Sequence, residues 1–286
     1  MGRSRRLPVV VYTPESKLKH PGQLMREMWR DLLASRELAW RLMIRDISAQ
    51  YRQSFLGIFW AFVPPLLMAI GFTYASNAQI INVGQTDLPY PAYVMLSTVL
   101  WQTFVEALNG PIQAVNMAKP MLAKINFPRE ALIVGKLGEV FFNFGIKLVL
   151  VILLFILFRM PITWTVILAP VALVHLVLLG SAVGLFLSPL GVLYQDVSRG
   201  LVVLVGVWFF LTPVVYPVPT GGSLAWLVQF NPVTPLLVTT RELATTGIVT
   251  NPVGFWLASS LAFIGLLGAW LVYRVTMPII IERMSA

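Results

Sequence analysis

The sequence predicts an all-α membrane protein with an N-terminal amphipathic interface helix, six transmembrane helices, and short re-entrant gate helices between the fifth and sixth spans. Hydrophobic residues occupy 57% of the 286 positions and charged residues only 12%, whereas soluble domains are about 25% charged. The charges cluster between long apolar runs, and Lys and Arg outnumber Asp and Glu by 21 to 12. Because short cytoplasmic loops of membrane proteins collect Lys and Arg, this basic excess indicates topology rather than nucleic-acid binding.

Residues 1–54 are expected to form a cytoplasmic segment, since eleven cations fall within the first 52 residues. A signal peptide is a poor interpretation because Pro8 interrupts the short apolar run there, so we expect the N-terminus to remain uncleaved. Further on, apolar residues recur at spacings of four, three and four, which predicts a helix lying in the membrane interface. These residues are Trp40, Ile44, Ile47 and Tyr51. Ser35 is a candidate N-cap dividing the region into two helices.

Six apolar segments, within a membrane domain of residues 55–276, are long enough to cross a bilayer, which takes about 20 residues. They cover approximately residues 56–76, 90–118, 131–158, 162–187, 200–216 and 252–273. Pro64 and Pro65 lie in the first segment and are expected to kink it or break its upper half. A short tail, residues 277–286, follows the last span, and both termini are expected in the cytoplasm.

Two connections between the spans carry further signals. Four cations between the second and third spans mark a return to the cytoplasm: Lys119, Lys124, Arg129 and Lys136. Between Arg199 and Arg241 the chain is uncharged, but Pro and Gly interrupt its second half. One helix followed by two re-entrant pieces, residues 223–230 and 234–245 within a gate region of 222–246, fits this pattern best. In an alternative with seven spans, the side of the membrane changes for only one cation, so the charges do not separate the two topologies. The density of Pro residues favours re-entrant pieces.

Several function classes lack the residues that they require. The sequence contains no GxxxxGK[ST] phosphate loop, HExxH, GxSxG or dinucleotide fingerprint, so no catalytic residue is assigned and the chain cannot bind ATP in the P-loop manner. It has no Cys and only two His, which leaves no disulfide scaffold and argues against a metal site. His175 lies at membrane depth, where we favour a packing role over a substrate contact.

Two opposite charges at membrane depth are expected to form an interhelical ion pair. Lys147 lies eleven residues after Lys136, and Glu106 lies thirteen residues before Lys119 on the antiparallel neighbour. At about 1.5 Å of rise per residue, both are roughly 16–19 Å from the cytoplasmic surface. Either charge alone would be costly in hydrocarbon. Glu139 shares a helical face with Lys147 but lies two turns lower.

Three segments, in order and at the right spacing, resemble the permease subunits of bacterial ABC-type polysaccharide exporters, which export O-antigen, capsule and teichoic acid chains. The segments are RDISAQYRQSFLGIFWAFVPPL from Arg45, KINFPREALI from Lys124, and YQDVSRG from Tyr194 followed by WFFLTPVVYPV and NPVTPLL. The resemblance covers about residues 45–273, nearly the whole membrane region. Asn-Phe-Pro-Arg-Glu in a cytoplasmic loop is its most specific element.

The resemblance implies a homodimer above two copies of a separate ATP-binding subunit, which would hold the ATP and Mg, with no cofactor in this chain. Six helices also enclose too little volume for a polymer to pass, which favours a dimer independently. Residues 118–132 would form the coupling segment that contacts the ATPase. Its expected contact residues are Met121, Lys124, Phe127, Pro128, Arg129 and Glu130. Phe127 can be an apolar anchor and Pro128 fixes the backbone, whereas a bland alternative is a loop whose cations meet anionic lipid.

Sugar rings pack their C–H faces on aromatic side chains, and the resemblance implies that the first and fifth spans line the tunnel. The candidates are Phe59, Trp60, Phe62, Phe72, Tyr74, Trp208, Phe209, Phe210 and Tyr216. Lipid or interface packing is the alternative for each, and we expect about half to face the tunnel. The outer gate would include Trp226, Phe230, Asn231 and Pro232. Arg45 and Arg52 could bind a lipid-linked diphosphate or, equally well, anionic phospholipid.

The preferred function is therefore the transmembrane subunit of an ATP-driven exporter in the bacterial inner membrane, moving a polyprenyl-diphosphate-linked polysaccharide of O-antigen type. A capsule or teichoic acid exporter is the alternative within transport. A membrane glycosyl- or acyltransferase would need a polar catalytic cluster at one membrane face, and the candidate residues here are scattered. A secondary transporter is distinguished by its dependence on the proton gradient.

Overall fold

The computed structural model describes residues 21–52, 57–122, 124–125, 127–160, 162–219, 221–222 and 225–285. Regular structure in these residues is entirely helical, as predicted. The elements are α1 (Pro21–Ala34), α2 (Arg36–Arg52), η2 (Gly57–Ala61), α3 (Val63–Asn77), α4 (Tyr90–Leu122), α5 (Glu130–Leu157), η3 (Trp164–Ile167), α6 (Ala169–Leu193), α7 (Gln195–Leu211), α8 (Ala225–Phe230), α9 (Val233–Ala244) and α10 (Pro252–Ser285). The start of the basic N-terminal segment and residues 223–224 of the first gate piece lie outside the described residues.

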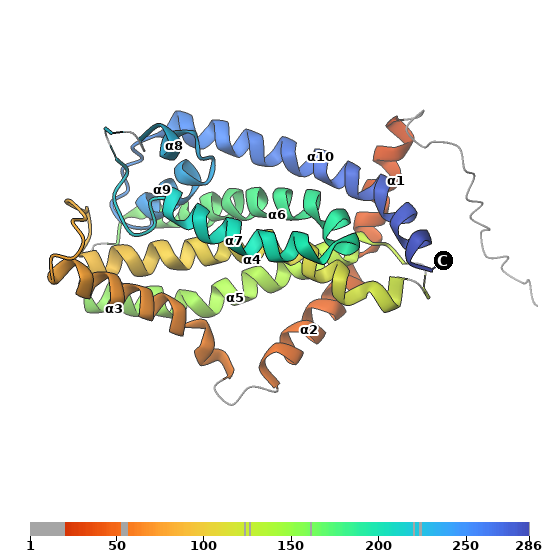
Figure 1. Cartoon of the computed structure of the whole chain (residues 1–286), viewed down its shortest axis with the longest axis horizontal. Helices are drawn as coiled ribbons and strands as arrows, with labels where there is room; N and C mark the ends of the chain where they lie inside the picture. The colour runs from red at the N-terminus through yellow and green to blue at the C-terminus, as the bar shows by residue number, and fades with distance from the viewer. Residues whose placement is uncertain are drawn as a thin grey trace, which may run out of the picture.

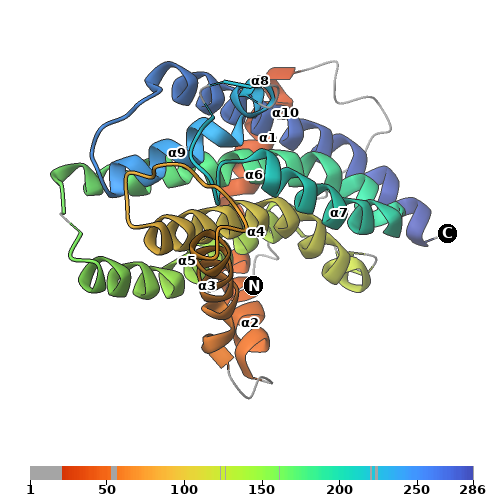
Figure 2. The same ribbon diagram turned by 60° about the vertical axis from the view of Figure 1, so that its left-hand side comes forward.

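The long helices run side by side along one axis, with α4 in the middle of the bundle in both views (Figures 1 and 2). The short helices α8 and α9 lie at one end, and α1 and the C-terminal end of α10 lie at the other (Figure 1). Below the bundle, α2 and α3 converge in a V. The chain therefore separates the expected gate helices from the expected cytoplasmic elements by the full length of the bundle.

Four of the described helical segments are long and apolar enough to cross a membrane: Gly57–Asn77, Glu130–Leu157, Ala169–Leu193 and Pro252–Glu282. The second and fifth expected spans are also helical, as α4 and α7. However, α7 has only 17 residues, and α4 contains Glu106 among other polar residues. Length and composition therefore support four spans directly.

Proline positions set several helix boundaries differently from the expected ones. Pro64 and Pro65 lie in the first turn of α3, just after a break from η2, where the missing N–H groups cost little. The helix α7 ends at Leu211 rather than near Tyr216, because Thr212 precedes Pro213 and has extended backbone angles of −110° and 135°. Ser35 separates α1 from α2 as expected, but its hydroxyl donates to the carbonyl of Leu32 at 2.6 Å and does not cap α2.

Small residues allow α6 to pack closely against α4. A Cβ atom added at Gly180 would lie 2.7 Å from the carbonyl oxygen of Phe104, and one added at Gly184 would collide with the carbonyl oxygen of Leu108. Membrane helices associate through such close backbone approach. The glycines therefore fix the contact at the centre of the bundle.

Gly184→Ala is expected to destabilise the protein by about 1–3 kcal/mol, because the added methyl group must push the backbones of α6 and α4 apart. Thermal unfolding of the detergent-purified protein measures the effect. Gly268→Ala on α10 is the matched control, since a Cβ atom there meets nothing within 4 Å. Equal melting temperatures for the two variants would contradict the close α4–α6 contact.

Candidate functional site

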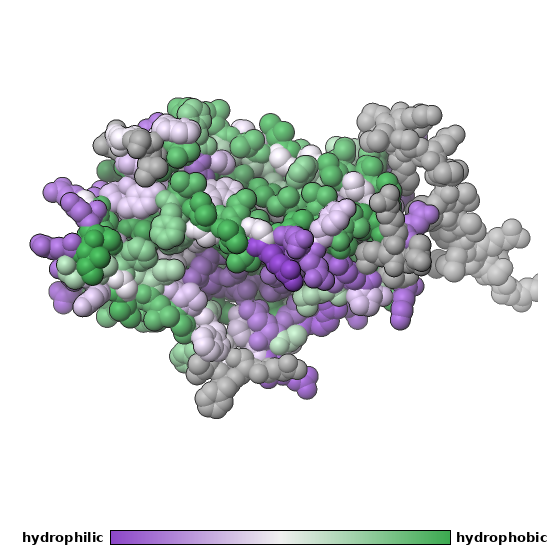
Figure 3. Space-filling view, in the orientation of Figure 1, coloured by the Kyte–Doolittle hydropathy of each residue, from purple (hydrophilic) through white to green (hydrophobic). Residues whose placement is uncertain are grey.

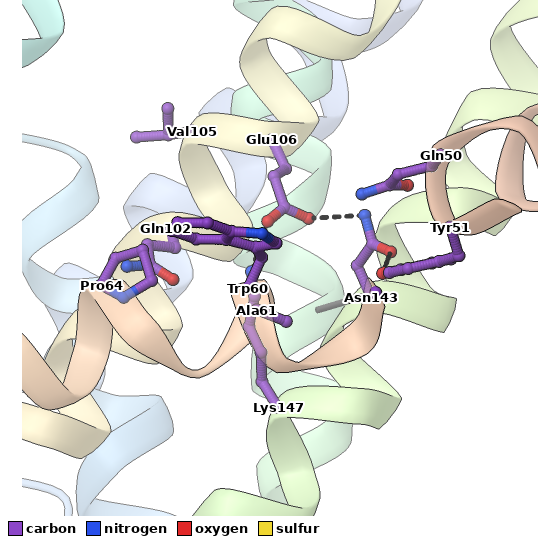
Figure 4. A pocket seen from close by; sticks show the side chains of 11 residues that line it. Gln50, Tyr51, Trp60, Ala61, Pro64, Gln102, Val105, Glu106, Asn143 and Lys147 are labelled. Carbon is purple, nitrogen blue, oxygen red and sulfur yellow. Dashed lines mark hydrogen bonds and ion pairs between the residues drawn. The ribbon is translucent and has the colours of Figure 1, made fainter. Parts of the chain in front are cut away.

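A cavity with polar side chains in a mostly apolar lining opens between α2, η2, α3, α4 and α5. Its volume is about 430 Å³. It is lined by Gln50, Tyr51, Gly57, Trp60, Ala61, Pro64, Gln102, Val105, Glu106, Asn143 and Lys147 (Figure 4). The sequence pattern predicts a role for Trp60, Glu106 and Lys147. It gives no signal for the amides of Gln50, Gln102 and Asn143, because each alone is an ordinary polar residue.

The predicted interhelical pair forms one wall of this cavity. Lys147 donates to one carboxylate oxygen of Glu106, and Asn143 donates to the other oxygen at 3.3 Å. Tyr51 of α2 in turn donates to the side-chain oxygen of Asn143 at 3.0 Å. The side chain of Lys147 is only 3% exposed, whereas that of Glu106 is 32% exposed. The lysine charge is thus satisfied within the wall, and the carboxylate keeps a face toward the cavity.

A smaller cavity of about 210 Å³ lies nearer the start of α5 and shares Gln50, Glu106 and Asn143 with the first. Glu139, the rival partner for Lys147, lies here instead. It accepts hydrogen bonds from Lys136 at 2.8 and 2.9 Å. The linings of the two cavities therefore contain two ion pairs and several neutral amides.

The aromatic tunnel candidates differ in exposure. Phe59, Trp60, Tyr74 and Phe210 are 57–70% exposed. By contrast, Phe209 is 7% exposed and stacks edge-on against Trp101 in the core, so it does not line a tunnel as expected. Phe62, Phe72, Trp208 and Tyr216 are partly buried. Only one side of α3 and of α7 faces away from the bundle. Consecutive residues point in different directions around a helix, so a run of aromatic residues places some of them outside and others against the core.

At the end of the bundle that contains α8 and α9, Asn231 is a buried residue with several hydrogen bonds rather than an exposed gate residue. It is 8% exposed, accepts from the indole N–H of Trp208 at 3.0 Å, and donates to the hydroxyl of Thr212 at 2.9 Å. Pro232 forms the start of α9. Trp226 and Phe230 are exposed, by 57% and 83%, and are available for the expected gate role.

A buried cation that the sequence pattern does not reveal lies at the same end of the bundle. Arg241, which the charge pattern places on the outer side, is 6% exposed. Its guanidinium donates to Ser97 at 2.8 Å and lies 4.0 Å from the ring centre of Tyr93. Tyr93 and Tyr90 donate to backbone carbonyls of residues 213–216. These contacts hold the segment after α7 and satisfy several of its backbone carbonyls.

The expected coupling segment lies between α4 and α5, and its residues point in different directions. Phe127 and Met121 are partly buried against an apolar core formed by α2, α4, α5, α6 and α10. Glu130 is 2% exposed and pairs with Arg274 at 2.7 Å, so it does not face outward as expected. Ile125, which the sequence did not distinguish, is 59% exposed. Lys124 is exposed, and Pro128 and Arg129 are partly exposed.

Arg274 joins three elements at this end of the bundle. It pairs with Asp31 of α1 as well as with Glu130 of α5. The neighbouring Tyr273 is buried, and its hydroxyl donates to the carbonyl of Arg129 at 3.5 Å.

The two arginines that could bind a lipid-linked diphosphate make fewer contacts within the protein. Arg45 pairs with Asp46 at 2.8 Å, and Arg52 is exposed in the last turn of α2.

His175 has the packing role that the sequence favoured. Its Nδ1 lies 2.8 Å from the carbonyl oxygen of Val171, and its ring meets Phe255 edge-on at 5.4 Å between centroids. Within the described part of the chain, no group of three His, Asp or Glu side chains could hold a metal ion.

Comparison with known proteins places the chain in a family. Residues 37–243 match the ABC-2 type transporter family. The O-antigen export system permease protein RfbA of Myxococcus xanthus is 27% identical over 226 residues, which are 77% of this chain and 84% of that protein. Two proteins of the same name from Klebsiella pneumoniae are 22% and 20% identical over 71% and 72% of this chain, and 78% and 79% of their own lengths. The family match covers most of the bundle and all residues of the polar cavity, so this chain belongs to the ABC-2 type transporter family of membrane proteins.

Proposed function

We propose that this chain is the membrane permease of an ABC exporter that moves a polysaccharide of O-antigen type out of the cytoplasm. The main support for this proposal is the family match over residues 37–243, together with three relatives named as O-antigen export permeases. The polar, partly aromatic cavity is consistent with a sugar cargo. A capsule or teichoic acid chain is the alternative cargo, and export of the native polymer by a deletion strain carrying this gene distinguishes the two.

The proposed assembly is a homodimer bound to two ATP-binding subunits, which hold ATP and Mg, in the bacterial inner membrane. Exposed apolar residues along α7 support a surface covered by a second copy or by lipid: Val202, Val203, Leu204, Val207 and Phe210. In this proposal α4 and α7 complete six spans, α8 and α9 form the outer gate, and both termini lie in the cytoplasm. The opposite placement of α1 and α9 in the bundle supports that orientation.

The proposed cargo is linked to a polyprenyl diphosphate. Arg52 supports this step, because it is an exposed cation at the end of α2, next to the start of the first span, and Arg binds phosphate oxygens through a forked set of donors. Arg45 contributes less free charge, since Asp46 already pairs with it.

Ile125→Ala is expected to reduce co-purification of the ATP-binding subunit by about tenfold, which corresponds to about 1.4 kcal/mol. An exposed apolar side chain is the type of anchor that fills a pocket on a partner. Ile248→Ala, at a residue 71% exposed near the other end of the bundle, is the matched control and should retain the partner.

The combined change Phe127→Ala with Arg129→Ala is also expected to weaken the complex, in part through loss of the packing beneath the loop. If both this double variant and Ile125→Ala co-purify with the ATPase as the parent does, the coupling assignment is wrong. The loop would then be a membrane-surface segment whose cations meet anionic lipid.

A further inference from the structure

The large cavity between α2 and α5 has a charge balance that disfavours ionic ligands. Among the described residues of its lining, only Glu106 and Lys147 are charged, and they pair with each other. Lys147 is 3% exposed in its side chain, so it offers no free cation for a phosphate group. A diphosphate would instead meet the exposed part of the Glu106 carboxylate, which would repel it.

The neutral polar groups of the cavity can bind hydroxyls. Gln50 and Gln102 each carry a carboxamide with donor and acceptor atoms, and no hydrogen bond of either side chain occurs among the described residues. Glu106 accepts one bond at each oxygen, and an ionised carboxylate has about four acceptor positions. The cavity therefore has spare hydrogen-bonding capacity on α2 and on two successive turns of α4.

An aromatic surface lies beside these groups. Trp60 is 57% exposed, and it lines the same cavity as Gln102 and Glu106 (Figure 4). The π-face of an indole attracts weakly positive hydrogens, such as those on the C–H face of a pyranose. Because Gln50 and Gln102 line the same cavity, a ring stacked on the indole could direct hydroxyls toward both amides.

The volume of the cavity and its position at the surface fit one sugar unit of a polymer. Small-molecule sites usually measure about 300–1,000 Å³, and this cavity measures about 430 Å³. The molecular surface in Figure 3 shows hydrophilic side chains gathered in a hollow between the α7 layer and the V of α2 and α3, within a mostly hydrophobic face. A polymer passing along that face could place one ring in the hollow.

We propose that this cavity is a sugar-binding subsite that holds one uncharged monosaccharide unit, stacked on Trp60 and hydrogen-bonded by Gln50, Gln102 and Glu106. The proposal rests on the proposed polysaccharide export function and adds the side chains that contact the cargo. The ion pair with Lys147 orients the carboxylate, and the exposed part of that carboxylate faces the cavity without a free cation beside it, which makes the subsite selective for neutral rings.

Cysteine protection tests the subsite directly, because the chain contains no Cys and a single introduced thiol can be followed on it by mass spectrometry. Ala61→Cys places the thiol in the cavity lining without removing a proposed contact. In the purified complex with its ATPase, maltose is expected to slow maleimide labelling of this thiol several-fold. Sorbitol, which has hydroxyls but no ring face, should have little effect.

Two controls separate binding in the cavity from general effects. Ile248→Cys should label at the same rate with and without maltose, because it lies in the loop before α10. Trp60→Ala in the Ala61→Cys background should abolish protection, while Trp60→Phe keeps part of it. Both Trp60 variants should melt near the parent temperature, since the side chain is largely exposed.

Lack of maltose protection, equal protection by sorbitol, or protection that survives Trp60→Ala would each overturn the subsite. Protection by inorganic pyrophosphate in place of maltose would overturn it too, in favour of a diphosphate site. Surface display of polysaccharide by cells that carry the parent protein is scored in parallel. A parent that exports polymer without maltose protection refutes the subsite alone, whereas a parent that exports none refutes the proposed function.

Discussion

Lys147→Glu is expected to remove most of the folded protein from the membrane. The substitution places a second carboxylate against Glu106 where the side chain of Lys147 is now 3% exposed. Breaking a buried pair by removing one partner costs about 3–5 kcal/mol, and whole domains are stable by only about 5–15 kcal/mol. The measurement is the yield of monodisperse protein and its melting temperature after mild extraction.

The double variant Glu106→Lys with Lys147→Glu is expected to recover most of the lost yield, because the pair is rebuilt with its charges exchanged. Arg41→Glu serves as the control for charge reversal in general. Its pair with Glu37 is exposed at both ends, by 73% and 78%, and exposed pairs contribute at most about 1 kcal/mol. If the double variant is as unstable as Lys147→Glu alone, the two groups do not act as a pair.

Arg274→Ala is expected to cost a similar amount, about 3–5 kcal/mol, because it leaves two carboxylates without their shared cation. The side chains of Asp31 and Glu130 are 25% and 3% exposed. Loss of the bridge should also release α1 from the bundle, and limited proteolysis of purified protein should then cut near α1 sooner. Arg274→Lys should be intermediate, since an ammonium cannot bind both carboxylates with a planar fork.

The control for this second change is Arg199→Ala. The contact between Arg199 and Asp196 is 3.6 Å long and both side chains are more than 75% exposed, so its loss should change the melting temperature little. Equal behaviour of Arg274→Ala and Arg199→Ala would show that Arg274 does not hold α1 and α5 together.

The relative position of two residues along neighbouring helices was predictable from the sequence, because helical rise is regular. The Glu106–Lys147 contact follows from that arithmetic and from the cost of a lone charge in hydrocarbon. The side of each helix that faces the rest of the bundle was not predictable. The burial of Phe209, the inward turn of Glu130 and the exposure of Ile125 depend on which side of each segment meets its neighbours.

Long-range polar contacts also leave little trace in the sequence. The sequence places Arg241 on the outer side, within the re-entrant piece 234–245, whereas the structure buries it beside Tyr93, nearly 150 positions earlier in the chain. Arg274 likewise looks like an ordinary basic residue after the last span, although its partner Asp31 lies near the other end of the sequence. Proline positions marked the irregular segment after α7, but not the tyrosines that hold it.

The central claim, that this chain is the passage of an ATP-driven polysaccharide exporter, is tested most directly by measuring surface polymer under separate control of ATP and the proton gradient. Cells express the chain with its ATP-binding partner, and newly exported polymer is quantified by antibody. Export should persist when the proton gradient is collapsed while ATP is maintained, and should stop when the phosphate-loop lysine of the partner is replaced. Export that follows the proton gradient and ignores the ATPase substitution would contradict the account.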